Sequence, residues 1–296
     1  EDGNNVYLTI DETIQSICEK YMQKGVEDNN VLNKGVCIAM DVNTGAILAM
    51  VTTDGYDLNN PYELSAKDKK KIKSTPKKKQ AEAESAALSN MWRNKAVADT
   101  YMPGSVFKMC VASAALEENL VNEKTSFTCT GSISVEGETI HCSNISGHGT
   151  QNFVEAISNS CNPAFIQIGQ MLGAGKFRQY YQGFGFSDKT GIDLPGEADD
   201  EFWAEGKMGG VDLAVASFGQ NFAITPIQMI TACAAVSNGG YVVQPHVVSK
   251  ITDSKGNVIK SVDKKVKRQV ISDDTSKKMK EYLEYNTERQ GAAAGY

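Results

Sequence analysis

The stretch that decides the fold is Tyr101-Met102-Pro103-Gly104-Ser105-Val106-Phe107-Lys108. Proline and glycine interrupt the chain just before a helix-forming run, which predicts a helix over residues 105–120 with Ser105 in its first turn. The free N–H groups of a first turn favour negative charge, so a serine there can form an anionic adduct. Lys108 follows on the same face, where burial would let it act as a neutral base. Ser-x-x-Lys alone also occurs by chance in structural helices.

A second polar group stands at Ser160-Cys161-Asn162, between apolar segments at 153–157 and 164–172 that predict two helices. A hydroxyl and a carboxamide two residues apart at such a junction can face one cleft. Ser160 can then relay a proton from Lys108, and the Asn162 amide can hold both the lysine and a substrate amide. The alternative interpretation is a capping turn, because serine and asparagine favour such positions.

These two motifs resemble the first two active-site motifs of the penicillin-binding transpeptidases, and their order and spacing are similar to those of the class B, monofunctional members. The resemblance extends over nearly the whole chain, with the lysine-rich stretch described below as its clearest departure. Further matching segments lie at residues 8–11 followed by Gln15, and at 41–50, 184–197 and 217–220.

The resemblance implies the α+β fold of penicillin-binding proteins and serine β-lactamases, an antiparallel sheet flanked by helices with a largely helical subdomain. One transpeptidase domain is expected over residues 1–296. In the family a Lys-Thr-Gly strand carries the third motif and should follow the helix that ends near Tyr285, so we expect the C-terminal strands to be missing from this chain. Lys189-Thr190-Gly191 is rejected as that motif, because it lies in a loop that family members share.

The resemblance also implies a reaction. Ser105 would attack the penultimate D-Ala carbonyl of a peptidoglycan stem peptide ending in D-Ala-D-Ala, with Lys108 as base. Ser160 and Asn162 would complete the proton relay and position the peptide, and β-lactams would acylate the same serine. A membrane glycosyltransferase is the implied partner, at the extracytoplasmic face of the bacterial membrane. Two alternatives stay open: a β-lactamase or β-lactam-sensing receptor of the same fold, and a non-catalytic scaffold in a wall-synthesis complex.

Bulk composition agrees with a soluble globular domain and excludes little else. The chain has 296 residues, of which 41% are hydrophobic and 22% charged, and its net charge is −6. The negative balance gives no indication of nucleic-acid binding. The sequence contains no run of 18 apolar residues and no signal peptide, so we expect any membrane anchor to lie outside this chain.

Seven cysteines, an odd number, argue against a fully paired disulfide framework. Four of them lie in apolar or helical contexts and are expected to be free core thiols, namely Cys18, Cys37, Cys110 and Cys233. The other three cluster with a histidine and suggest a closed structural zinc site formed by Cys129, Cys142, His148 and Cys161. A Cys129–Cys142 disulfide, three unlinked thiols, and His141 in place of His148 remain alternatives.

Residues 65–80 form a lysine-rich insertion, with eight lysines between positions 67 and 79. Because it has few apolar residues to bury, we expect a mobile loop on the surface. The functional alternative is attraction to an anionic polymer or lipid surface. Elsewhere the pattern predicts a strand at 6–10, a helix capped by Asp11, and a hairpin of strands at 35–40 and 46–52. It also predicts helices at 81–88, 226–236 and 272–285 and strands at 241–251 and 263–270.

Overall fold

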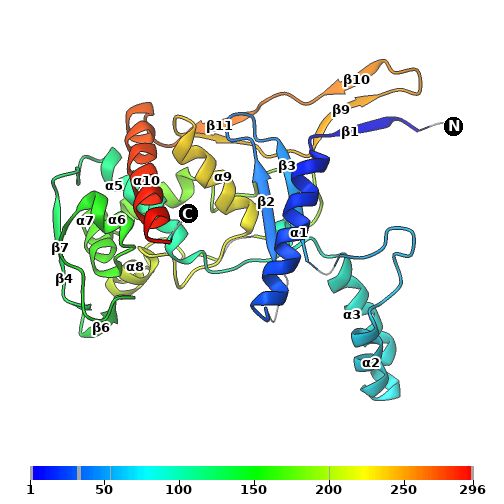
Figure 1. The fold of residues 1–296 in the computed structure, drawn as a ribbon, viewed down its shortest axis with the longest axis horizontal. Coiled ribbons are helices and arrows are strands. Elements are labelled where there is room, and N and C mark those ends of the chain that lie inside the picture. The colour runs from blue at the N-terminus through cyan, green and yellow to red at the C-terminus, as the bar shows by residue number, and fades with distance from the viewer. Residues whose placement is uncertain (1–2, 32–34, 54, 200, 295–296) are drawn as a thin grey trace.

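A helix packed on a hairpin forms one side of the molecule (Figure 1). The computed structural model describes residues 3–31, 35–53, 55–199 and 201–294. Asp11 caps helix α1 (Glu12–Asp28), as predicted, by accepting the N–H of Ile14. Strands β2 (Val36–Met40) and β3 (Ile47–Thr52) pair antiparallel, with Ala39 opposite Ala49, which confirms the predicted hairpin. The helix is fixed to the hairpin because the Gln15 amide exchanges hydrogen bonds with both backbone groups of Met50.

Two further antiparallel units are built from residues 241–269, and one of them also takes in the N-terminal strand. Strand β9 (Val248–Thr252) pairs with β1 (Asn5–Leu8) on one side and β10 (Val258–Ser261) on the other. Strand β8 (Tyr241–Val243) pairs with β11 (Val266–Gln269). The single strand predicted over 241–251 is therefore wrong, since it divides into β8 and β9 at Pro245, which has no N–H for a ladder.

The helical part holds the main hydrophobic core. Its largest fully buried side chains include Phe153, Phe165, Tyr181, Phe184 and Phe186. Helix α5 lies against α7, and α10 lies against α6, α9 and α5. The helices of this part have the following bounds: η2 (Gly104–Phe107), α5 (Lys108–Glu117), α6 (Phe153–Ser158), α7 (Asn162–Gly183), α8 (Gly210–Ala216), α9 (Pro226–Ser237) and α10 (Asp273–Ala294).

Four short strands between α5 and α6 were not predicted. Strand β4 (Ser126–Cys129) pairs with β7 (Gly149–Asn152), and β5 (Ser132–Val135) pairs with β6 (Glu138–His141), all antiparallel. Each has only four residues; three of them mix polar with apolar side chains and β7 has no apolar side chain, which leaves little periodic signal. The segment that these strands form, residues 126–152, contains three of the four predicted metal ligands.

The lysine-rich segment is helical, so the irregular loop predicted for residues 65–80 is wrong. It forms helix α2 (Ala66–Ser74) and the short turn η1 (Lys77–Lys79), followed by α3 (Gln80–Trp92) and α4 (Lys95–Ala98). Ser65 caps α2 by accepting the N–H of Asp68, and lysine itself is a good helix former. Burial is not needed for this helix, because no residue of α2, η1 or α3 is buried. Helices α2 and α3 extend away from the rest of the fold (Figure 1); the mobility of this segment stays a prediction.

The arrangement confirms the predicted α+β class, with antiparallel strand pairs around a largely helical part. Within the part of the chain that the structure describes, the helices are too short or too polar to cross a lipid bilayer.

Candidate active site

Ser105 lies in the first turn of a helix and is open to solvent. It belongs to the 3₁₀ turn η2, which continues directly into α5. The chain before it is fixed, because Tyr101 exchanges two backbone hydrogen bonds with Ile224 and the Gly104 N–H donates to the Gly219 carbonyl at 2.8 Å. The nucleophile predicted from sequence is thus exposed on a held backbone.

The backbone around Gly219, in the matching segment 217–220, explains why this position is glycine. Its φ is +84°, and a Cβ there would lie 2.0 Å from the carbonyl oxygen of Gly104. Any other residue would push the turn before Ser105 out of position. The segment 217–220 therefore supports the nucleophile through its backbone.

Lys108 is buried, with 4% of its surface exposed. Its Nζ donates to the Ser160 carbonyl at 2.7 Å, to Ser160 Oγ at 2.9 Å and to Asn162 Oδ1 at 2.8 Å. Burial lowers the pKa of this ammonium from 10.5 to about 8, while the nearby Cys161 and Cys142 thiols act in the opposite direction. The structure thus brings Ser160 and Asn162 onto Lys108, as the sequence predicted.

The junction that presents Ser160 and Asn162 is tightly constrained. Helix α6 begins with a capping box between Asn152 and Glu155, and its end passes into the start of α7 within three residues. Ser160 has φ of +47°, a left-handed conformation that costs a serine roughly 1–3 kcal/mol and persists only where the surroundings enforce it. Its N–H donates to the Ile157 carbonyl, so the turn is held from within as well as by Lys108.

This geometry suits acyl transfer. A turn of the helix separates Ser105 from Lys108, and residues three apart in a 3₁₀ turn lie above one another. Once Lys108 is neutral, it can accept the serine proton, while Ser160 and Asn162 keep it oriented through the bonds they already make.

Lys189-Thr190-Gly191 lies in a loop rather than on a strand, in agreement with its rejection as the third motif. The backbone N–H groups of Thr190 and Gly191 donate to the carboxylate of Glu197. This tripeptide is therefore held by its own loop.

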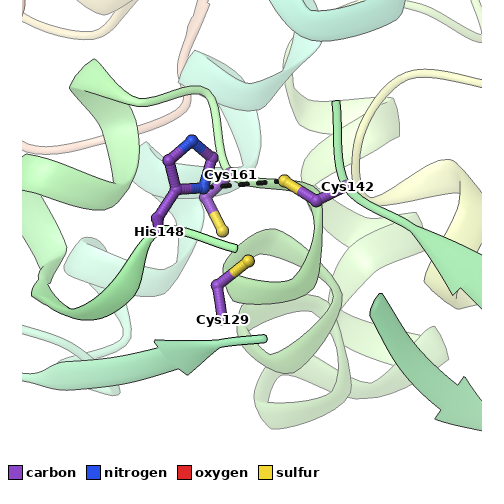
Figure 2. A group of neighbouring side chains, drawn as sticks. All are labelled: Cys129, Cys142, His148 and Cys161. Atoms are coloured by element: carbon purple, nitrogen blue, oxygen red, sulfur yellow. Dashed lines mark hydrogen bonds between the residues drawn. The ribbon is translucent and has the colours of Figure 1, made fainter. Parts of the chain in front are cut away.

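Three sulfur atoms and a histidine ring converge beside the catalytic junction (Figure 2). One ligand atom from each of Cys129, Cys142, His148 and Cys161 lies within 4.8 Å of the others, and Cys142 Sγ is 3.6 Å from His148 Nδ1. The three cysteines are buried and carry free thiols, whereas the His141 side chain is exposed and lies outside this group. Tetrahedral zinc with Zn–S bonds of about 2.3 Å would place its sulfurs roughly 3.8 Å apart, so the separations fit such an ion.

Backbone N–H groups face two of the three sulfur atoms, those of Cys142 and Cys161. Burial alone would raise the pKa of the Cys142 thiol, but the N–H groups of Asn144 and Asn162 reverse this and the pKa is lowered. Cys161 faces the N–H of Ala164, although burial raises its pKa to about 12. Hydrogen bonds of this kind typically support metal-bound thiolates.

Sequence reasoning missed Gln151, which lies on β7 behind the cluster with only 3% of its surface exposed. Its side chain reaches the Cys161 thiol and also accepts a hydrogen bond from Asn159 at 2.8 Å. Its sequence context, Gly149-Thr150-Gln151-Asn152, has no apolar side chain and no motif, so it gave no signal.

Comparison with known proteins agrees with this geometry. The family described as penicillin binding protein transpeptidase domain matches residues 35–296. Stage V sporulation protein D of Bacillus subtilis is 34% identical over 286 residues, covering 96% of this chain and 41% of that protein. Peptidoglycan D,D-transpeptidase PbpA of Mycolicibacterium smegmatis is 28% identical over 306 residues, covering 99% of this chain and 59% of that protein. The chain therefore spans less than two thirds of these relatives.

Solved structures show the same fold. The crystal structure of PBPA from Mycobacterium tuberculosis has a TM-score of 0.80 at 25% identity, covering 98% of this chain and 65% of that one. An imipenem acyl-enzyme complex of penicillin-binding protein A from M. tuberculosis has a TM-score of 0.77 at 26% identity, covering 95% and 62%. The chain belongs to the penicillin-binding protein transpeptidase family, as a class B member.

Proposed function

We propose that this domain is a serine D,D-transpeptidase of peptidoglycan. Ser105 Oγ attacks the carbonyl carbon of the penultimate D-Ala, and its proton passes to the neutral amine of Lys108. The peptide C–N bond breaks, and the terminal D-Ala leaves with a proton returned through Ser160. An amine of a second stem peptide then attacks the ester, which forms the cross-link and frees Ser105.

One observation carries this proposal: a buried lysine that donates three hydrogen bonds to Ser160 and Asn162 lies one turn from an exposed serine at a helix start. Burying a lysine that has no such role would destabilise the fold, because its ammonium group loses hydration. The relatives named as D,D-transpeptidases support the same assignment.

Labelling with a fluorescent penicillin tests the proposal. We expect the natural protein that carries this domain to be labelled, and Ser105→Ala to lose all label. Ser74→Ala, a change at an exposed serine of α2, is the matched control and should label like wild type. Full labelling of Ser105→Ala would contradict the proposal and would leave the scaffold alternative open.

The β-lactamase alternative makes a different kinetic prediction. A transpeptidase should keep its penicilloyl adduct, whereas a β-lactamase should release it within seconds. Measuring the decay of the adduct after excess penicillin is removed separates the two.

We also propose that the natural protein works at the extracytoplasmic face of the membrane, together with a membrane glycosyltransferase. The support is chemical, since stem peptides lie outside the membrane and cross-linking needs newly polymerised glycan strands. External protease should degrade the protein in intact spheroplasts, and crosslinking at the domain surface should capture a glycosyltransferase. Protection from protease would contradict the location.

We propose in addition that Cys129, Cys142, His148 and Cys161 hold one structural zinc ion. The fit rests on three thiols and one imidazole whose ligand atoms lie within 4.8 Å of one another, and on backbone N–H groups that face the Cys142 and Cys161 sulfurs. A zinc ion would supply the charge that holds the thiols as thiolates. With four protein ligands it would leave no position for a reactive water, so its role is to fasten residues 129–148 to the α6–α7 junction.

Elemental analysis of protein purified without added metal tests the zinc proposal. Wild type and Cys18→Ser, which alters a cysteine outside the cluster, should contain about one zinc per chain, and Cys161→Ser should contain far less. Wild-type protein without zinc, with a Cys129–Cys142 disulfide in its mass spectrum, would contradict the proposal.

A further inference from the structure

The side-chain amide of Gln151 forms a hydrogen bond through its oxygen but not through its nitrogen. It lies on β7 opposite Phe127 of β4, two residues before Cys129, and its side chain is buried. The Oε1 atom accepts the side-chain N–H of Asn159 at 2.8 Å. The Nε2 atom makes no hydrogen bond to oxygen, nitrogen or sulfur among the described residues. A buried amide N–H in that state is unfavourable, so its position calls for an explanation.

The group beside this amide is the Cys161 thiol, whose pKa the Gln151 side chain lowers. A thiol is a weak acceptor, whereas a thiolate bound to a metal carries more charge and accepts N–H groups well. The donor that lacks a good partner in the metal-free protein would therefore gain one when the cluster binds an ion.

We propose that Gln151 is a positioning residue that couples the metal cluster to the catalytic junction. Its amide N–H supports the Cys161 thiolate, and its carbonyl oxygen holds Asn159, the residue before Ser160. This inference rests on the proposed zinc site and deepens it.

The coupling follows from the chain path. Asn159, Ser160, Cys161 and Asn162 are consecutive, and Ser160 has a left-handed φ that its surroundings must enforce. Lys108 holds this turn from the side of the nucleophile. Gln151 holds it from the opposite end, because one amide group contacts both Asn159 and the next-but-one residue, Cys161.

Gln151→Met tests this role because methionine keeps the length and the buried volume but removes the donor and the acceptor. Zinc affinity, measured by competition with a chromophoric chelator, should fall about 10–100-fold. Gln167→Met is the matched control. The Gln167 amide donates to the Pro163 carbonyl within the same helix start, so this variant should bind zinc within about two-fold of wild type.

Cobalt(II) substitution supplies a readout that general destabilisation would not move. A hydrogen bond withdraws charge from a metal-bound sulfur, so its loss should shift the sulfur-to-cobalt charge-transfer band of Gln151→Met to longer wavelength. The band of Gln167→Met should stay in place. Unchanged zinc affinity and an unchanged band in Gln151→Met would overturn the inference while leaving the zinc site itself intact.

Two other outcomes are also decisive. If wild type binds neither zinc nor cobalt at the cluster, the zinc proposal fails, and this inference fails with it. If Gln151→Met does not fold, Asn159→Ala replaces it, because this change removes the bond that orients the amide. Zinc should then bind several-fold more weakly, and wild-type affinity in Asn159→Ala would contradict the coupling.

Discussion

Lysine side chains lie in two very different environments in two regions of this molecule. In α2 and η1, eight lysines face solvent on a helix pair without a buried residue. In α5, a single lysine is buried among apolar side chains, with its amine held by Ser160 and Asn162. Burial lowers the pKa of Lys108 and fixed acceptors orient its amine, which makes it the candidate base, whereas a high local density of lysines in α2 and η1 provides neither.

Replacing the buried lysine should have the largest effect. Lys108→Arg keeps the positive charge but cannot deprotonate in the working range, so the β-lactam acylation rate should fall by at least about 100-fold. Stopped-flow acylation measures this. Lys176→Arg changes an exposed, ion-paired lysine on α7 and should remain near wild type. A Lys108→Arg rate within a few-fold of wild type would remove the base role.

Loss of the metal should weaken the helix junction that holds this lysine. Binding energy that exists only in the native state adds to stability, so chelation or Cys161→Ser should lower the melting temperature by roughly 5 °C or more. Acylation should slow indirectly through Ser160 and Asn162. Differential scanning calorimetry with and without chelator checks this, and an unchanged melting temperature on chelation would contradict a structural metal.

Removing the exposed lysines should have the smallest effect. Replacement of residues 65–80 by a short glycine-serine linker should leave acylation by a soluble β-lactam within about two-fold of wild type, because no residue there is buried and helix α2 extends away from the rest of the fold. A large loss of rate would show that the lysine-rich helix forms part of the substrate cleft.

The sequence predicted the parts whose signal is local. Ser105 and Lys108 follow a Pro-Gly break, and Ser160 and Asn162 lie between two apolar helical segments, so residue type and spacing sufficed. The structure places Lys108 on Ser160 and Asn162 as expected, and it brings the four predicted metal ligands together.

What escaped prediction depends on tertiary context or on competing local effects. The lysine-rich segment was predicted as a loop because it cannot bury apolar area, yet capping by Ser65 and helix propensity suffice. Pro245 divides a strand that apolar composition alone had joined. Gln151 could not be found, because its importance lies in Asn159 and Cys161, which only folding brings beside it.

The pH dependence of acylation tests the central claim, that a buried neutral lysine activates Ser105, most directly. Since burial lowers the Lys108 pKa to about 8, the neutral fraction rises tenfold per pH unit below that value and levels off above it. The second-order acylation rate with a β-lactam that is stable over the range should follow this curve between pH 6 and 9.5. A rate that is constant over this range, or that still rises tenfold per unit at pH 9.5, would contradict it.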